Sequence, residues 1–149
     1  KGYFEKAYPD YKNMYNTRAN VFKTAEIVTG DGYGSVNFPD DSNVEIVPGP
    51  QRASTITLQF DEKETSLNFK ATFSNKESIA NECNPERDGE INLTVLEDGK
   101  EIKKLYITHK QDVPITLDIS GRKKITLIVD KGKNEDYCDW FKLTDFTVK

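Results

Sequence analysis

Residues 67–73 form the sequence Leu67-Asn68-Phe69-Lys70-Ala71-Thr72-Phe73, in which apolar and polar side chains alternate. Successive side chains of a β-strand point to opposite faces, so this period of two predicts a strand with one buried and one solvated face. The same alternation returns in residues 54–60, 91–95, 115–119 and 125–129. Because turn-forming residues bound each run, we expect antiparallel strands whose apolar faces share a core.

Tight-turn dipeptides separate several of these segments. Asp98-Gly99 permits positive φ, so residues 91–97 and 101–107 on either side of it are predicted to form a hairpin. Ser120-Gly121 predicts the same kind of turn, joining the strand before it to residues 124–129.

The last segment breaks the alternation. Phe141 and Leu143 fall on one face, whereas Phe146 and Val148 are out of phase with them, which predicts a β-bulge near Thr144-Asp145. About eight short strands, almost no helix and several tight turns predict an all-β fold, an antiparallel β-sandwich of the jelly-roll type. The immunoglobulin class is the main alternative, but the only Trp follows the second Cys, contrary to the Cys–Trp–Cys order of that class.

The first fifty residues are less regular. A short helix is expected over 9–15, and strands are expected over 21–23 and 25–28. No linker or repeat divides the chain, so residues 1–149 are expected to form a single β-sandwich module. The chain begins with neither Met nor a signal-like apolar segment, so we expect a processed form or a module of a longer protein.

The charge of the chain argues against two classes of partner. The 149 residues include 21 Lys and Arg against 25 Asp and Glu, a formal net charge of -4. A mildly acidic surface without a basic cluster is not expected to bind nucleic acid or an anionic membrane surface. No stretch approaches the ~20 apolar residues of a membrane span, so no membrane insertion is expected.

Cys83 and Cys138 are the only cysteines. With neither a neighbouring His nor a Cys-x-x-Cys spacing, they are not expected to bind a metal. Two alternatives remain, a pair of buried thiols or one disulfide. The disulfide is favoured because both residues lie in polar, loop-like stretches, and it would imply an oxidising, extracellular setting.

From Leu67 onward, the order of features resembles a known family. The features are a strand at 69–73, a polar loop ending in Asp88-Gly89, segments 91–100, 115–121 and 125–130, and a Gly- and Asp-rich loop leading into Asp139-Trp140. This order resembles the NPCBM-like carbohydrate-binding jelly rolls at the N-terminus of some glycosidases, which are related to the galactose- and blood-group-antigen-binding modules. The resemblance implies a galactose-binding-domain-like jelly roll that binds glycans without catalysis, as part of a secreted or surface multi-domain protein.

The loop at residues 131–141 combines groups suited to sugar recognition. Tyr137 and Trp140 offer aromatic faces for the apolar side of a pyranose, and Asp136 and Asp139 offer carboxylates for its hydroxyls. We therefore predict ligand contacts from Tyr137, Asp139 and Trp140. The alternative is that Trp140 caps the core while the acidic residues are solvated.

A second polar loop, residues 74–88, supplies supporting candidates. Arg87 has a planar fork of donors, Asn84 pairs a donor with an acceptor, and Asp88 adds a carboxylate. If the cysteines pair, their Cα atoms must lie within about 7 Å, and the two loops would form a preorganised rim at one end of the sandwich. The alternative is a solvated surface loop.

Cofactors are not expected. Asp130, Gly132, Asn134 and Asp136 alternate as oxygen ligands do in calcium loops, but lysines intervene and no glutamate follows at the EF-hand distance. A structural calcium ion is therefore disfavoured, although jelly-roll sugar binders often carry one.

Catalysis is not expected either. His109 is the only His, and it follows a strand at a position expected to be exposed. No Ser or Cys has a recognisable base beside it, and no Gly-rich phosphate loop is present. Carboxylates are plentiful, so a small hydrolase with a carboxylate pair is the weakest of three hypotheses.

Aromatic residues also gather near the N-terminus and in the turn predicted at residues 31–34. They are Tyr3, Phe4, Tyr8, Tyr11, Tyr15 and Tyr33. Such residues usually fasten a terminal segment or belong to a turn, but together they could form a patch for a protein partner. The leading hypothesis is a non-catalytic carbohydrate-binding module, and the alternative is a protein–protein adhesion or assembly module.

Overall fold

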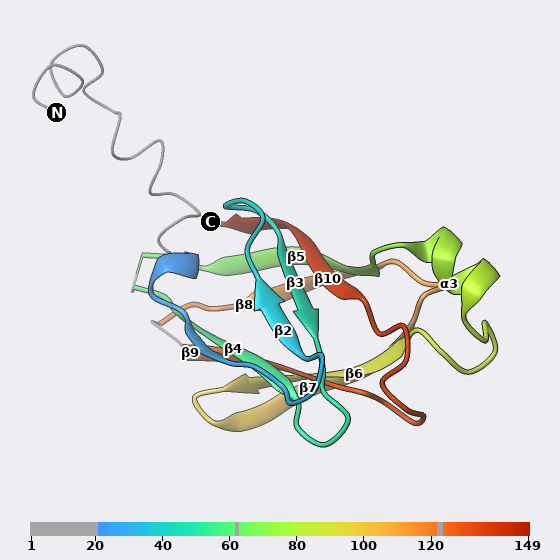
Figure 1. Cartoon of the computed structure of the whole chain (residues 1–149). Helices are drawn as coiled ribbons and strands as arrows, with labels where there is room; N and C mark the ends of the chain where they lie inside the picture. The colour runs from blue at the N-terminus through green and yellow to red at the C-terminus, as the bar shows by residue number, and fades with distance from the viewer. Residues whose placement is uncertain (1–20, 62, 122–123) are drawn as a thin grey trace, which may run out of the picture.

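The computed structural model describes residues 21–61, 63–121 and 124–149. These residues form two five-stranded antiparallel sheets packed face to face (Figure 1). Sheet A contains, in spatial order, β1 (Glu26–Val28), β4 (Ser54–Gln59), β9 (Lys124–Asp130), β6 (Glu90–Glu97) and β7 (Lys100–Thr108). Sheet B contains β2 (Ser35–Asn37), β3 (Val44–Val47), β10 (Phe141–Val148), β5 (Ser66–Phe73) and β8 (Val113–Asp118). The predicted antiparallel β-sandwich is confirmed.

The predicted hairpin and the predicted bulge are both present. Asp98 and Gly99 turn the chain between β6 and β7 with φ angles of 50° and 85°. In the pairing of β10 with β5 the register shifts between Thr144 and Thr147, where Asp145 has a φ of 59°. The bulge turns both apolar pairs of β10, Phe141 with Leu143 and Phe146 with Val148, toward the core. It therefore explains why the alternation in the sequence breaks between the two pairs.

The core lies between the two sheets and consists of the inward side chains of the alternating segments. Aromatic rings fill its centre: Phe69 stacks on Phe146 with ring centroids 4.8 Å apart, and Phe22 meets the edge of Phe146 at 5.1 Å. Phe73 and Phe141 form another edge contact at 5.3 Å. Burying each such side chain contributes about 1.5–3 kcal/mol to folding, so this packing fixes where the connecting loops begin.

Three expectations about the connections are wrong. Residues 21–23 are helical rather than extended. The polar loop at 74–88 contains the helix α3 (Lys76–Glu82), which buries Ile79 against the core. The turn at Ser120-Gly121 closes no hairpin, because β8 pairs with β5 in sheet B whereas β9 pairs with β4 and β6 in sheet A. A turn dipeptide reverses the chain but does not select the strand with which the next segment pairs.

His109 is buried rather than exposed, with only 8% of its surface accessible. Its backbone N donates to Gly89 O at 2.8 Å, and its ring Nδ1 lies 3.3 Å from the same oxygen. The helix expected over 9–15 and the aromatic residues at positions 3–15 lie outside the described residues. Among the helices that are described, none has the length and apolar character needed to cross a bilayer.

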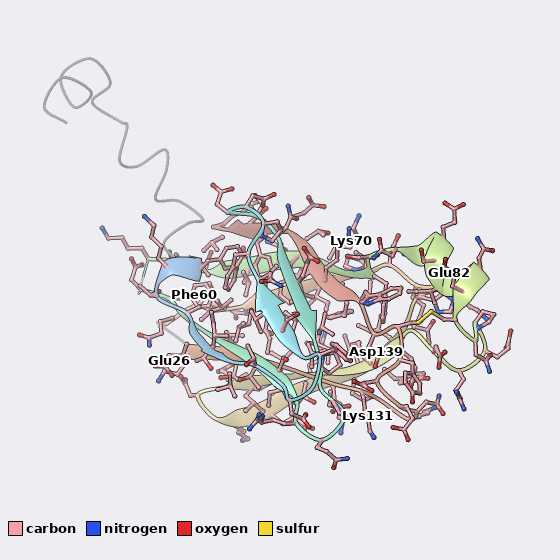
Figure 2. All side chains as sticks on the ribbon, in the orientation of Figure 1. Glu26, Phe60, Lys70, Glu82, Lys131 and Asp139 are labelled. Atoms are coloured by element: carbon pink, nitrogen blue, oxygen red, sulfur yellow. A yellow bond between two sulfur atoms is a disulfide. The ribbon has the colours of Figure 1, made fainter. Side chains whose placement is uncertain are left out.

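The connecting loops divide between two ends of the sandwich. The loops before β6 and β10 lie at one end together with α3, whereas the helical residues 21–23 and the C-terminus lie at the opposite end (Figure 1). Figure 2 shows Glu82 at the end with α3 and Phe60 toward the other. The two polar loops singled out in the sequence therefore share the end that faces away from the C-terminus.

Candidate functional site

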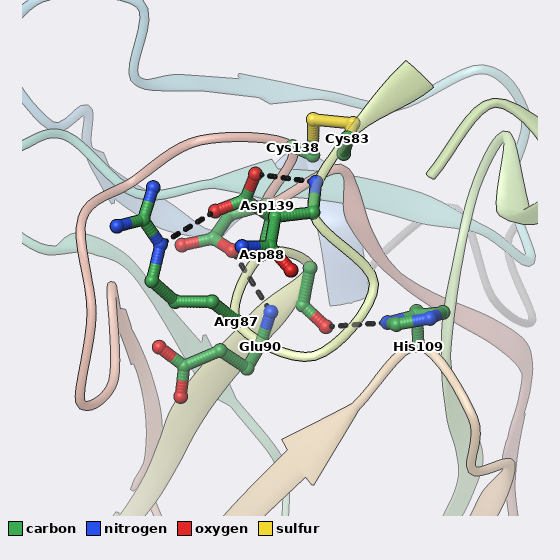
Figure 3. The surroundings of a disulfide bond; sticks show 9 residues. Cys83, Arg87, Asp88, Glu90, His109, Cys138 and Asp139 are labelled. Carbon is green, nitrogen blue, oxygen red and sulfur yellow. Dashed lines mark hydrogen bonds and ion pairs between the residues drawn. A yellow bond between two sulfur atoms is a disulfide. The ribbon is translucent and has the colours of Figure 1, made fainter. Parts of the chain in front are cut away.

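The predicted disulfide is present and joins the two polar loops. The Cα atoms of Cys83 and Cys138 are 6.6 Å apart, and Cys83 directly follows α3. Figure 3 shows the bond above the carboxyl groups of Asp88 and Asp139. The prediction that these loops meet at one end of the sandwich is therefore correct.

Glu90, the first residue of β6, organises the loop beside it. It is only 2% exposed, and its Oε1 and Oε2 accept the backbone N–H groups of Asn134 at 2.7 Å and Lys133 at 3.1 Å. Gly132 has a φ of 76°, and a Cβ there would lie 2.7 Å from Glu90 Oε2, so glycine is required. Burial and hydrogen bonding to Glu90 raise the pKa of Tyr106 to about 12. A buried carboxylate saturated by donors thus holds the loop in one conformation.

Asp139 ties the end of the same loop to β6. It is 1% exposed, and its Oδ1 accepts the backbone N–H of Glu90 at 2.9 Å. Its Oδ2 has no hydrogen-bond partner among the described residues. Burial, reinforced by the charges of Glu90, Asp136 and Asp88, outweighs that hydrogen bond and raises the pKa of Asp139 to about 8. At neutral pH the group is therefore largely a neutral acid rather than an exposed anion.

A hollow of about 700 Å³ opens where this loop meets the β2–β3 side of the sandwich. Its lining residues are Gly32, Tyr33, Ser35, Glu45, Val47, Pro50 and residues 135–140. Tyr33 is 93% exposed, Tyr137 is 58% exposed, and Trp140 is half-buried with part of its surface against the core. No Lys, Arg or His is among these lining residues. Three aromatic side chains and several carboxyl groups therefore face one cavity.

The structure brings together only part of the predicted contact set. Tyr137, Asp139 and Trp140 line the hollow, although the carboxyl group of Asp139 is enclosed. Arg87 and Asp88 instead line a separate, much smaller hollow of about 60 Å³, and Asn84 lines neither of the two.

Asn84, Arg87 and Asp88 bind mainly to one another. The backbone N of Asn84 donates to Asp88 Oδ2 at 2.9 Å, and Asn84 O accepts the backbone N of Arg87 at 3.0 Å. Arg87 Nε lies 3.5 Å from Asp88 Oδ1. These contacts stabilise the turn between α3 and β6, and their part in ligand binding stays a prediction.

Sequence reasoning missed the far wall of the hollow. Glu45 and Val47 come from β3, and Pro50 comes from the connection that follows it. Tyr33 is the one residue of this wall that the sequence singles out, as a turn residue that could contact a partner, since an aromatic side chain at a turn tip has little to pack on. Nothing in the sequence indicates that β3 lies beside the start of β10.

Residues of the calcium-like spacing make other contacts in the structure. Asp130 Oδ1 accepts the backbone N of Gly132 at 2.8 Å, and Asn134 Nδ2 donates to Arg87 O at 3.1 Å. Asp136 lines the aromatic hollow. The alternating oxygens thus support the turn and the cavity separately.

Comparisons with solved structures identify the fold. The CBM51 from the GH95 protein of Clostridium perfringens, solved with methyl-galactose, superposes with a TM-score of 0.63 at 13% identity, covering 83% of this chain and 92% of that one. The structure of the M60 catalytic domain with the CBM51-1 and CBM51-2 domains of ZmpB, also from Clostridium perfringens, gives a TM-score of 0.64 at 12% identity, covering 83% and 14%. The tandem CBM51 modules of the family 98 glycoside hydrolase from Streptococcus pneumoniae SP3-BS71 give 0.54 at 15% identity, covering 86% and 42%.

At such low identity these matches establish the fold alone. No curated protein sequence matches the chain. A family model described as the NPCBM/NEW2 domain matches residues 51–148, well over half of the chain and all strands from β4 onward. The resemblance found in the sequence is therefore confirmed, and the chain belongs to the NPCBM/NEW2 domain family.

Proposed function

We propose that this domain binds uncharged sugars in the hollow lined by Tyr33, Tyr137 and Trp140, without transforming them. The observation that carries the proposal is the composition of that hollow, in which three aromatic side chains and the acidic residues Glu45 and Asp136 line about 700 Å³. This volume lies within the range of about 300–1,000 Å³ that is usual for small-molecule sites.

The chemistry of the lining suits a pyranose. Aromatic faces pack against the apolar C–H side of the ring, and carboxylates accept hydrogen bonds from its hydroxyl groups. With no basic side chain among the described lining residues, an anionic sugar would face carboxylates without a counter-charge. The preferred ligand is therefore a neutral sugar.

The loop carrying Tyr137 and Trp140 is preorganised for binding. The disulfide, the Glu90 carboxylate and the buried Asp139 each fix one part of it. Such fixation lowers the conformational entropy lost when a ligand binds. Asn84, Arg87 and Asp88 support the site in the same indirect way.

The setting we propose is extracellular, as one module of a larger protein. A disulfide is expected in an oxidising compartment, and one joins the two loops of this end of the sandwich. A single small site of this kind binds weakly, and attachment to a larger protein raises the effective concentration of the module at its target.

Glycan-array binding of the purified domain tests the proposal. We expect neutral glycans to bind, and we expect Tyr137→Ala and Tyr33→Ala each to weaken binding at least about fivefold, since both remove an aromatic contact. Ile102→Ala is the matched control, because Ile102 is exposed on β7 in the other sheet. A blank array, or equal loss in all three variants, would contradict the proposal, and a blank array would favour the adhesion-module alternative.

Prolonged incubation with each bound oligosaccharide tests the absence of catalysis. We expect the oligosaccharide to be recovered intact by mass spectrometry. Cleavage that disappears in Glu45→Gln would identify a hydrolase instead.

A further inference from the structure

We propose that the site accepts a glycan chain rather than a single terminal sugar, because a second hollow on the outer face of sheet B continues the first. This inference rests on the proposed function and adds a subsite to it. The second hollow has a volume of about 310 Å³ and is lined by Asn43, Glu45, Ser74, Lys142 and Thr144, among others. Glu45 lines both hollows, so the two cavities adjoin at this residue.

The strand register places the second hollow on a polar row across sheet B. Asn37 is opposite Glu45, Glu45 is opposite Lys142, and Lys142 is opposite Thr72. Side chains on one face of a sheet stand side by side at the strand spacing, so donors and acceptors follow one another across β2, β3, β10 and β5. Two neighbours in this row, Glu45 and Lys142, line the second hollow, and Glu45 also lines the first.

The length of the groove exceeds one sugar ring. Trp140, in the first hollow, directly precedes β10, and Thr144, in the second, lies four residues further along the chain. An extended strand advances about 3.3 Å per residue, so these two positions are about 13 Å apart. A pyranose seated against Trp140 leaves room along β10 for the residues linked to it.

The two hollows differ in chemistry, and this difference determines which sugar of the glycan occupies each hollow. The first offers aromatic faces, whereas no aromatic side chain is among the described residues lining the second. The second offers the ammonium group of Lys142 and the carboxylate of Glu45, and beside them the buried Oγ1 of Thr144 has no hydrogen-bond partner among the described residues. Hydroxyl groups of the second and third sugars form hydrogen bonds with these side chains, and the first sugar stacks on the aromatic faces of the first hollow.

Isothermal titration calorimetry with sugars of two lengths tests the inference. The probes are methyl galactoside with β-1,4-galactotetraose, and N-acetylglucosamine with chitotetraose. In the series that binds, we expect the tetrasaccharide to bind at least tenfold more tightly than the monosaccharide. Thr144→Val removes only the unpaired hydroxyl, and Lys142→Ala removes the ammonium group. Each should weaken tetrasaccharide binding about threefold to tenfold while leaving monosaccharide binding unchanged.

Lys104→Ala is the matched control, since Lys104 is exposed on β7 of sheet A. Equal affinity for the two lengths, or a length advantage that survives both Thr144→Val and Lys142→Ala, would overturn the inference and leave the proposed function standing. No binding by any of the four probes, together with a blank glycan array, would overturn both.

Discussion

Replacing Asp139 by asparagine tests how the loop is held, and the effect depends on pH. Asp139 is 1% exposed, its Oδ1 accepts the backbone N–H of Glu90 at 2.9 Å, and its Oδ2 lacks a hydrogen-bond partner among the described residues. Asparagine keeps the acceptor for Glu90 and cannot ionise. The substitution therefore removes the titration while preserving the hydrogen bond.

The sign of the effect follows from the pKa of Asp139, which burial raises from its ordinary value of 3.8 to about 8 in the folded protein. Between these values the unfolded chain has lost the proton while the folded chain keeps it, so the stability due to this group falls as the pH rises. The slope is about 1.4 kcal/mol per pH unit, which sets an upper limit of roughly 6 kcal/mol over the whole window. Below pH 4 the stabilisation is fully present, and above pH 8 no more is lost.

Urea unfolding at pH 5, 6, 7 and 8 measures this dependence, followed by the fluorescence of Trp140, the only tryptophan. We expect wild-type stability to fall across this range and Asp139→Asn to flatten the decline, so that the variant is the more stable protein at pH 8. Asp41→Asn is the control, because Asp41 is exposed. Parallel pH profiles for wild type and Asp139→Asn, or a variant that is less stable at pH 8, would refute the reasoning.

Three further predictions concern the loop and its ligand. Replacing Cys83 and Cys138 by serine should cost about 4 kcal/mol in urea unfolding, as expected for a loop closed over a sequence separation of 55; a loss below 1 kcal/mol would show that the loops hold together without the bond. Gly132→Ala should lower the melting temperature more than Gly99→Ala. Both glycines have positive φ, but only Gly132 lies against the Glu90 carboxylate. Equal shifts in melting temperature would argue against that contact. Galacturonic acid should compete for the site at least tenfold less well than galactose in the same titration, and equal competition would contradict the charge argument.

The strands were predictable because their signal is local. In residues 67–73 every second side chain is apolar, and each of them is buried in β5. The break in the alternation of apolar and polar residues in β10 was also enough to predict the bulge beside Asp145. Burial on one face of a sheet imposes a period of two, which any short window of sequence records.

The missed features depend on contacts between distant segments. Helix α3 is only seven residues long and buries a single side chain, Ile79, so its sequence carries too few apolar positions for a helical period to appear. His109 is buried because the chain near Gly89 packs over it, 20 residues away in sequence. Polarity alone could not reveal either feature.

The candidate site was predictable on one side only. Tyr137 and Trp140 stood out because aromatic and acidic residues cluster in one loop, and the polar surroundings of the cysteines indicated which loops meet. Glu45 belongs to the site because β3 pairs with β10, although the two strands are nearly a hundred residues apart in the chain. Antiparallel partners at that distance leave no trace in a single sequence.

The indole N–H of Trp140 gives the most direct test that sugars bind in the aromatic hollow. Because the chain has one tryptophan, its indole N–H gives one resonance in a 15N-labelled NMR spectrum, and Trp140 lines the hollow. We predict that this resonance shifts saturably when methyl galactoside or N-acetylglucosamine is added, together with the backbone resonances of Tyr33 and Tyr137. An indole signal that stays fixed while a sugar perturbs residues around Arg87 and Tyr106 instead would contradict the account.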